Sequence, residues 1–94
     1  MADSTRYEIS AYDDQGQRLS LNPDPEAPER IYADTIWEAV GSLAAVPAQA
    51  WMHWDDGETE AITVSRVVLQ HLEVTQRRRG GPVYSTNTLE VINR

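Results

Sequence analysis

One segment of the chain carries both the start and the stop signals of an α-helix, and this restricts the fold more than any other feature. Thr35 and Glu38 have the spacing of a capping box, and Pro47 prevents a helix from continuing past Val46. The apolar residues between these limits share one helical face: Ile36, Val40, Leu43 and Ala44. The sequence therefore predicts one main helix over about residues 35–46, with Val40 on the side that faces the core.

Turn signals flanked by alternating apolar and polar residues occupy much of the remaining chain, and they indicate antiparallel strands. Gly16 lies in the turn of a first hairpin over residues 6–22, and the Asp56-Gly57 pair lies in that of a second over residues 49–65. Residues 66–76 fit two interpretations. A helix would carry one polar stripe, but their valines favour a strand, which we prefer and which predicts a third hairpin over residues 67–92.

These elements predict an α+β fold in a single domain that covers residues 1–94. In this fold, a small antiparallel sheet of about four to five strands packs against the main helix. The acidic, proline-rich residues 22–29 are expected to carry the chain from the sheet edge to the helix without regular structure. Because so small a domain gains stability when it associates, the sequence is also compatible with a homodimer.

The sequence also bears on where the protein works. It contains no cysteine, which excludes disulfides and thiolate metal sites. Residues 1–6 lack the apolar run of a signal peptide, and no part of the chain approaches the roughly 18 apolar residues of a membrane span. We therefore expect a cytoplasmic protein that has no membrane partner.

Charge is distributed unevenly along the chain. Residues 1–60 carry thirteen of the fifteen acidic residues and only three arginines, a net charge of −10, whereas residues 61–94 carry +3. Such an acidic surface attracts basic partners and repels the phosphates of nucleic acids. The distribution therefore predicts a protein partner with a basic surface.

No arrangement of residues in the sequence points to catalysis. His53 is close in sequence to four acids that could hold a divalent cation, so one alternative is a small enzyme or metal-binding protein around His53. The spacing of these acids does not match a calcium-binding loop, and neither a nucleophile elbow nor a glycine-rich phosphate loop occurs. We therefore predict that the protein has no catalytic residue, no metal and no cofactor.

Three consecutive arginines give a second alternative. Arg77, Arg78 and Arg79 precede a glycine pair and could clamp phosphates at a hairpin tip, as in a nucleic-acid-binding regulator. Three arginines neutralise few phosphates, however, and the acidic first sixty residues would repel the rest of a duplex. Nucleic acid is therefore the less favoured partner.

Two tryptophans lie three residues apart on a predicted strand, and strand pleating would direct Trp51 and Trp54 to opposite faces. A two-residue turn would pair Trp51 with Ile62, whereas a three-residue turn would pair Ala50 with Ile62 and place Trp54 on the apolar side. Either register leaves one tryptophan facing away from the core unless another layer covers it. Because exposed tryptophan is enriched at interfaces, the outward one is predicted to anchor a protein partner.

These observations favour a non-enzymatic, acidic protein-binding module. Its predicted contact residues are Trp51, Trp54, Asp55, Asp56, Glu58 and Glu60. Because carboxylates can compete with phosphates for arginine-rich grooves, we expect an inhibitor that mimics nucleic acid in the basic site of a nucleic-acid-handling protein. In size and charge, although in no motif, the chain is similar to small phage-encoded anti-CRISPR and anti-restriction proteins.

Overall fold

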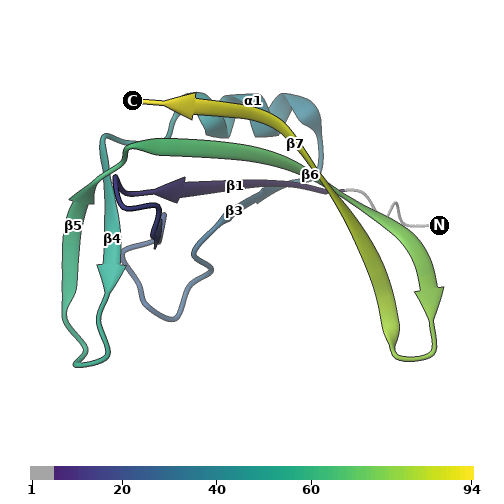
Figure 1. Ribbon diagram of the computed structural model, residues 1–94, viewed down its shortest axis with the longest axis horizontal. Helices are drawn as coiled ribbons and strands as arrows, with labels where there is room; N and C mark the ends of the chain where they lie inside the picture. The colour runs from purple at the N-terminus through teal and green to yellow at the C-terminus, as the bar shows by residue number, and fades with distance from the viewer. Residues whose placement is uncertain (1–5) are drawn as a thin grey trace.

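Two antiparallel sheets and one helix make up the part of the chain that the structure describes (Figure 1). The structure is a computed structural model that describes residues 6–94, with the backbone alone at residues 74–78 and 81–84. The elements are β1 (Arg6–Tyr12), β2 (Arg18–Leu19), β3 (Ile31–Ala33), α1 (Ile36–Ala44), β4 (Gln49–His53), β5 (Thr59–Thr63), β6 (Arg66–Arg78) and β7 (Gly81–Asn93). This architecture agrees with the predicted α+β class, but the strands form two sheets rather than one.

β1 is an inner strand of the five-stranded main sheet. On one edge it pairs along its whole length with β6, from Arg6 opposite Leu72 to Tyr12 opposite Arg66. Its other edge is shared by β2 and β3. The first predicted hairpin is therefore confirmed as β1 and β2, and Gly16 adopts a φ of 79° in its turn, a conformation that favours glycine.

Residues 22–29 do not take their predicted course to the helix. This segment closes on itself, because the N–H of Leu21 donates to the carbonyl of Glu29 and the side-chain amide of Asn22 donates to the carbonyl of Pro28, both at 2.8 Å. The chain thereby returns to the edge of β1 and forms β3 before the helix begins. β3 has three residues, too few for the alternation that identifies a strand in sequence.

β6 and β7 form a long hairpin, which confirms the preferred strand interpretation of residues 66–76 and the third predicted hairpin. Their pairing shifts register between Leu69 and Gln70 and again between Val74 and Gln76. Such bulges increase the local twist of a strand pair. Consistent with this, the hairpin curves away from the body of the molecule toward its turn at Arg79 and Gly80 (Figure 1).

α1 begins as the capping box predicts. The Thr35 hydroxyl accepts a hydrogen bond from the N–H of Glu38 at 3.2 Å. The Glu38 carboxylate accepts in turn from the N–H of Asp34 at 3.5 Å, one residue before the cap. The helix ends at Ala44 rather than Val46.

The predicted core-facing stripe of the helix is confirmed at Leu43 and wrong at Val40. Ala39 and Leu43 are buried, whereas Val40 is 49% exposed. After the helix, the Arg94 guanidinium donates to the carbonyls of Val46 and Pro47, both at 2.8 Å. This contact joins the residue after β7 to the end of the helical segment.

The core lies between α1 and one face of the main sheet. β1 contributes Ile9 and Ala11, which are fully buried, and β6 contributes Val67 and Leu69. Because side chains alternate along a strand, the residues between these positions point to the opposite face of the sheet, away from the helix.

Candidate functional site

The β4–β5 hairpin, which carries the predicted contact residues, forms a two-stranded sheet of its own. Ala50 pairs with Ile62, so the register is the one expected for a three-residue turn. Residues 55–57 form that turn, and Gly57 adopts a φ of 90° in it. The second predicted hairpin is therefore confirmed. The expectation that this register places Trp54 on the apolar side is wrong, because β4 ends at His53 and Trp54 lies beside the turn, whereas Trp51 packs against the core.

Hydrogen bonds within the turn hold its backbone in one conformation. The N–H of Trp54 donates to the Glu58 carbonyl at 2.8 Å, and the N–H of Gly57 donates to the Trp54 carbonyl at 3.0 Å. The Asp56 carboxylate accepts from the N–H of Glu58 at 2.9 Å. Acidic side chains are therefore displayed from a well-defined backbone.

Trp54 is the outward tryptophan, with 48% of its surface exposed. Its indole Nε1 donates to Oε1 of Glu60 at 3.1 Å, which orients the ring beside a carboxylate. The four acids predicted to surround it are all exposed: Asp55, Asp56, Glu58 and Glu60. We call Trp54 and these four acids the acidic tip.

Trp51 is half-buried and packs against the core, so it is not part of the acidic tip. Its backbone forms a bridge with Ser20, in which the two N–H groups donate to the opposite carbonyls at 2.7 and 2.9 Å. This bridge places the segment after β2 beside β4.

His53 links the second sheet to the segment of residues 22–29. Its Nε2 lies 3.0 Å from the Asn22 carbonyl, and its Nδ1 lies 2.9 Å from the Thr59 hydroxyl. Because a carbonyl only accepts, Nε2 carries the proton, and Nδ1 of a neutral ring accepts from Thr59. Both nitrogens are thus engaged in contacts within the chain, and no three metal-ligating side chains cluster within the described residues.

The arginine run lies at the other end of the molecule from the acidic tip (Figure 1). Arg79 is exposed in the turn between β6 and β7. The side chains of Arg77 and Arg78 lie outside the part of the chain that the structure describes. The two predicted contact regions are therefore separate surfaces.

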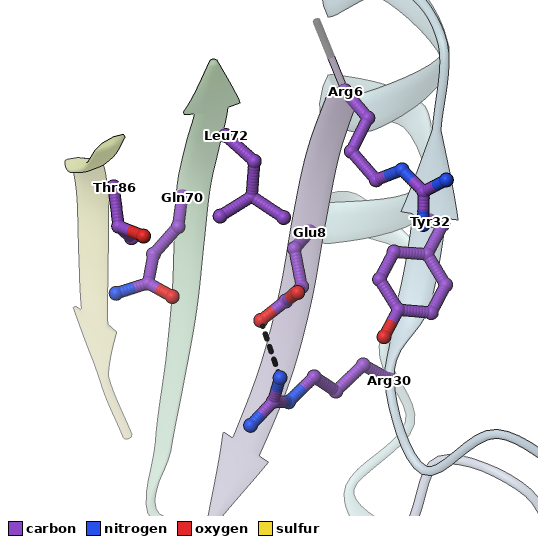
Figure 2. Close-up of a pocket in the computed structure, with 7 residues that line it drawn as sticks. All are labelled: Arg6, Glu8, Arg30, Tyr32, Gln70, Leu72 and Thr86. Carbon is purple, nitrogen blue, oxygen red and sulfur yellow. Dashed lines mark ion pairs between the residues drawn. The ribbon is translucent and has the colours of Figure 1, made fainter. Parts of the chain in front are cut away.

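A hollow of about 450 Å³ lies on the face of the main sheet opposite the helix (Figure 2). We call it the sheet hollow. Its lining comes from four strands and the residue before β3: Arg6, Glu8, Arg30, Tyr32, Gln70, Leu72 and Thr86. Nη1 of Arg30 lies 3.0 Å from Oε1 of Glu8, and the Arg6 guanidinium lies 5.0 Å from the centre of the Tyr32 ring.

Sequence reasoning missed two features of the surface. The sheet hollow depends on β3, which brings Tyr32 and Arg30 beside β1, and β3 gives no detectable sequence signal. Trp37 is 84% exposed on α1, more than any other large apolar residue in the described part of the chain. Trp37 follows Ile36 directly, so it lies outside the helical stripe that was assigned to the core. This position was the signal in the sequence that could have predicted its exposure.

Comparisons with known proteins give no relative, since no family model, curated protein or solved structure matches the chain. Within residues 6–94, no helix is long and apolar enough to cross a membrane.

Proposed function

We propose that this chain is a non-enzymatic, cytoplasmic protein-binding module that inhibits a partner by occupying its basic, nucleic-acid-handling site. One observation carries the proposal: a half-exposed Trp54, oriented by Glu60, at the end of a hydrogen-bonded acidic turn. An aromatic anchor surrounded by polar residues is the common composition of the energetically important part of an interface.

Trp54 supplies the affinity in this proposal. Burial of such a ring in a partner's pocket contributes on the order of 2 kcal/mol or more to binding. The hydrogen bond from Nε1 to Glu60 orients the ring before binding, so less side-chain entropy is lost in the complex.

In this proposal, the four carboxylates of the acidic tip determine which kind of partner binds. Arginine and lysine side chains that bind phosphates also bind carboxylates, and arginine does so with two parallel hydrogen bonds. Exposed charges steer the encounter of two proteins and mainly raise the association rate. A partner with a groove for nucleic acid fits both the charge and the chemistry of the tip.

The anchor is tested with matched tryptophan variants. The immobilised chain captures its partner from a lysate of the source organism, and the kinetics of the purified pair are measured by surface plasmon resonance. Trp54→Ala is expected to raise the dissociation rate about tenfold or more. Trp37→Ala, which removes the more exposed ring on α1, is expected to leave the rate unchanged. The reverse result would place the interface on the helix.

The carboxylates are tested by neutralisation. Changing Asp55 and Asp56 to Asn, and Glu58 and Glu60 to Gln, is expected to slow association and to flatten its dependence on salt. The charge-matched control neutralises four exposed acids elsewhere: Asp14, Glu26, Glu73 and Glu90. The unmodified chain is also expected to displace labelled DNA from the partner. Equal association rates for the two variants, or no displacement, would refute the proposed mode of inhibition.

A further inference from the structure

We propose that the sheet hollow binds a small organic oxyanion, that is, a carboxylate or phosphate group on an apolar body. The sheet hollow shares no residue with the acidic tip, so this inference is independent of the function proposed above. Its volume of about 450 Å³ lies within the range of small-molecule sites. The charges and surfaces that line it determine the class of ligand.

Arg30 is positioned by a carboxylate that is itself nearly inaccessible. Glu8 is 5% exposed on a face of the sheet that the helix does not cover, and its ion pair with Arg30 uses Nη1. A guanidinium has five N–H donors in a fixed plane, and one contact at Nη1 orients that plane. The Arg30 side chain is 33% exposed, so its other donors are not sealed from the solvent side of the sheet hollow.

Arg6 also lines the sheet hollow, where its side chain lies against Tyr32. Its guanidinium lies 5.0 Å from the centre of the Tyr32 ring, a cation–π contact that restricts the arginine without neutralising its charge. Figure 2 shows Glu8 at the centre of the sheet hollow, with Arg30 on one side and Arg6 and Tyr32 on another. Two guanidinium groups against one carboxylate leave an excess of one positive charge, so an anion is the complementary ligand.

The rest of the lining favours an anion that carries an apolar body. Leu72 lies opposite Arg6 on the neighbouring strand, and Tyr32 is 44% exposed, so hydrocarbon surface borders the charged groups. Gln70 and Thr86 add neutral hydrogen-bonding groups on the side of β6 and β7 (Figure 2). Polar groups placed beside the hydrocarbon of Leu72 and Tyr32 can hold the charged head and the apolar body of a small organic ligand.

The test is a titration of the whole chain with four probes, followed by backbone NMR. Benzoate and phenyl phosphate carry the two oxyanions on the same ring, benzamide lacks the charge, and inorganic phosphate lacks the ring. We expect saturable shifts at Arg6, Glu8, Arg30 and Gln70 with benzoate, phenyl phosphate or both, with a dissociation constant on the order of 1 mM for ligands this small. The stronger of the two identifies the oxyanion.

Two arginine variants and one control assign the shifts to the sheet hollow. Arg6→Gln and Arg30→Gln are each expected to weaken binding about tenfold. If Arg30→Gln does not fold, Arg6→Gln is sufficient for the test, because it leaves no buried charge unpaired. Arg18→Gln removes the same charge at an exposed pair with Glu29 and is expected to have no effect. Equal shifts with benzamide, equal affinity for inorganic phosphate, or unchanged affinity in Arg6→Gln would overturn the proposal.

Discussion

Glu8 is the residue whose placement is hardest to explain by stability alone. Its carboxylate is nearly inaccessible in the inner strand of the main sheet, and Arg30 is the group that balances its charge at 3.0 Å. Removing a carboxylate from water is costly, and an apolar pair of the same shape would often be at least as stable. The two partners are not equivalent, because Arg30 is one-third exposed and Glu8 is not.

This asymmetry gives a prediction about stability. Arg30→Met leaves a buried carboxylate without its cation and is expected to lower the free energy of unfolding by about 3 kcal/mol. Glu8→Gln keeps an oxygen acceptor and leaves Arg30 able to reach water, so it is expected to cost about 1 kcal/mol or less. Urea denaturation of both variants measures the difference. Equal losses would show that the pair is solvated rather than buried.

Single residues also show what sequence patterns can and cannot establish about the site. Alternation along a strand correctly separated Trp51 from Trp54, because pleating is a property of the backbone alone. It did not predict which of them is covered: the observed register was expected to place Trp54 on the apolar side, but Trp51 packs against the core and Trp54, beyond the end of β4, is half-exposed. Glu8 and Arg30 come together through β3, so the ion pair was not predictable from local pattern either.

At the scale of elements, the helix has boundaries that were predicted correctly and a buried face that was predicted only in part, at Leu43 but not at Val40. The capping box and Pro47 act locally, so they located α1 to within the ±2 residues by which helix ends normally vary. The face depends on the partner surface. Apolar residues occur on most sides of this helix, and Ile36, Trp37 and Val40 are all partly or largely exposed. Periodicity alone could not choose among these sides.

The observed face predicts which helix substitutions the protein tolerates. Leu43 is 9% exposed and lies in the core, so Leu43→Ala is expected to cost about 2–4 kcal/mol. Val40→Ala is expected to cost less than about 1 kcal/mol, and Val40→Asp to leave the domain folded, because the side chain is half-exposed. Thermal melting followed by circular dichroism compares the three. Unfolding of Val40→Asp would instead show that Val40 faces the core, as the sequence pattern predicted.

At the scale of the whole molecule, acidic and basic residues are separated in space as well as along the sequence. The acidic tip and the turn that holds Arg79 lie at opposite ends (Figure 1). A duplex long enough to contact one end would extend along a chain whose net charge is −7. Of these two ends, the one with Arg79 attracts the phosphate backbone of a duplex, and the acidic tip repels it.

We therefore predict that the protein does not bind duplex DNA tightly at about 150 mM salt. Fluorescence anisotropy of a labelled duplex, titrated with the chain at low and at physiological salt, is the measurement. Weak binding at low salt alone agrees with the charge distribution. Tight binding at about 150 mM salt that is lost when Arg77, Arg78 and Arg79 are changed to Ala would contradict it.

The pairing of β1 with β6 has a consequence for how the chain acquires its structure. Tyr12 pairs with Arg66 and Arg6 with Leu72, so this contact closes a loop that contains the helix and the second sheet. Hairpins between neighbouring segments form within about 1–10 μs, whereas closing so long a loop carries an entropic cost that slows folding. The β1–β2, β4–β5 and β6–β7 hairpins can therefore form early, whereas β1 pairs with β6 late. During synthesis on a ribosome, β1 emerges well before β6, so the apolar side chains of β1 stay exposed until β6 is available to pair with it.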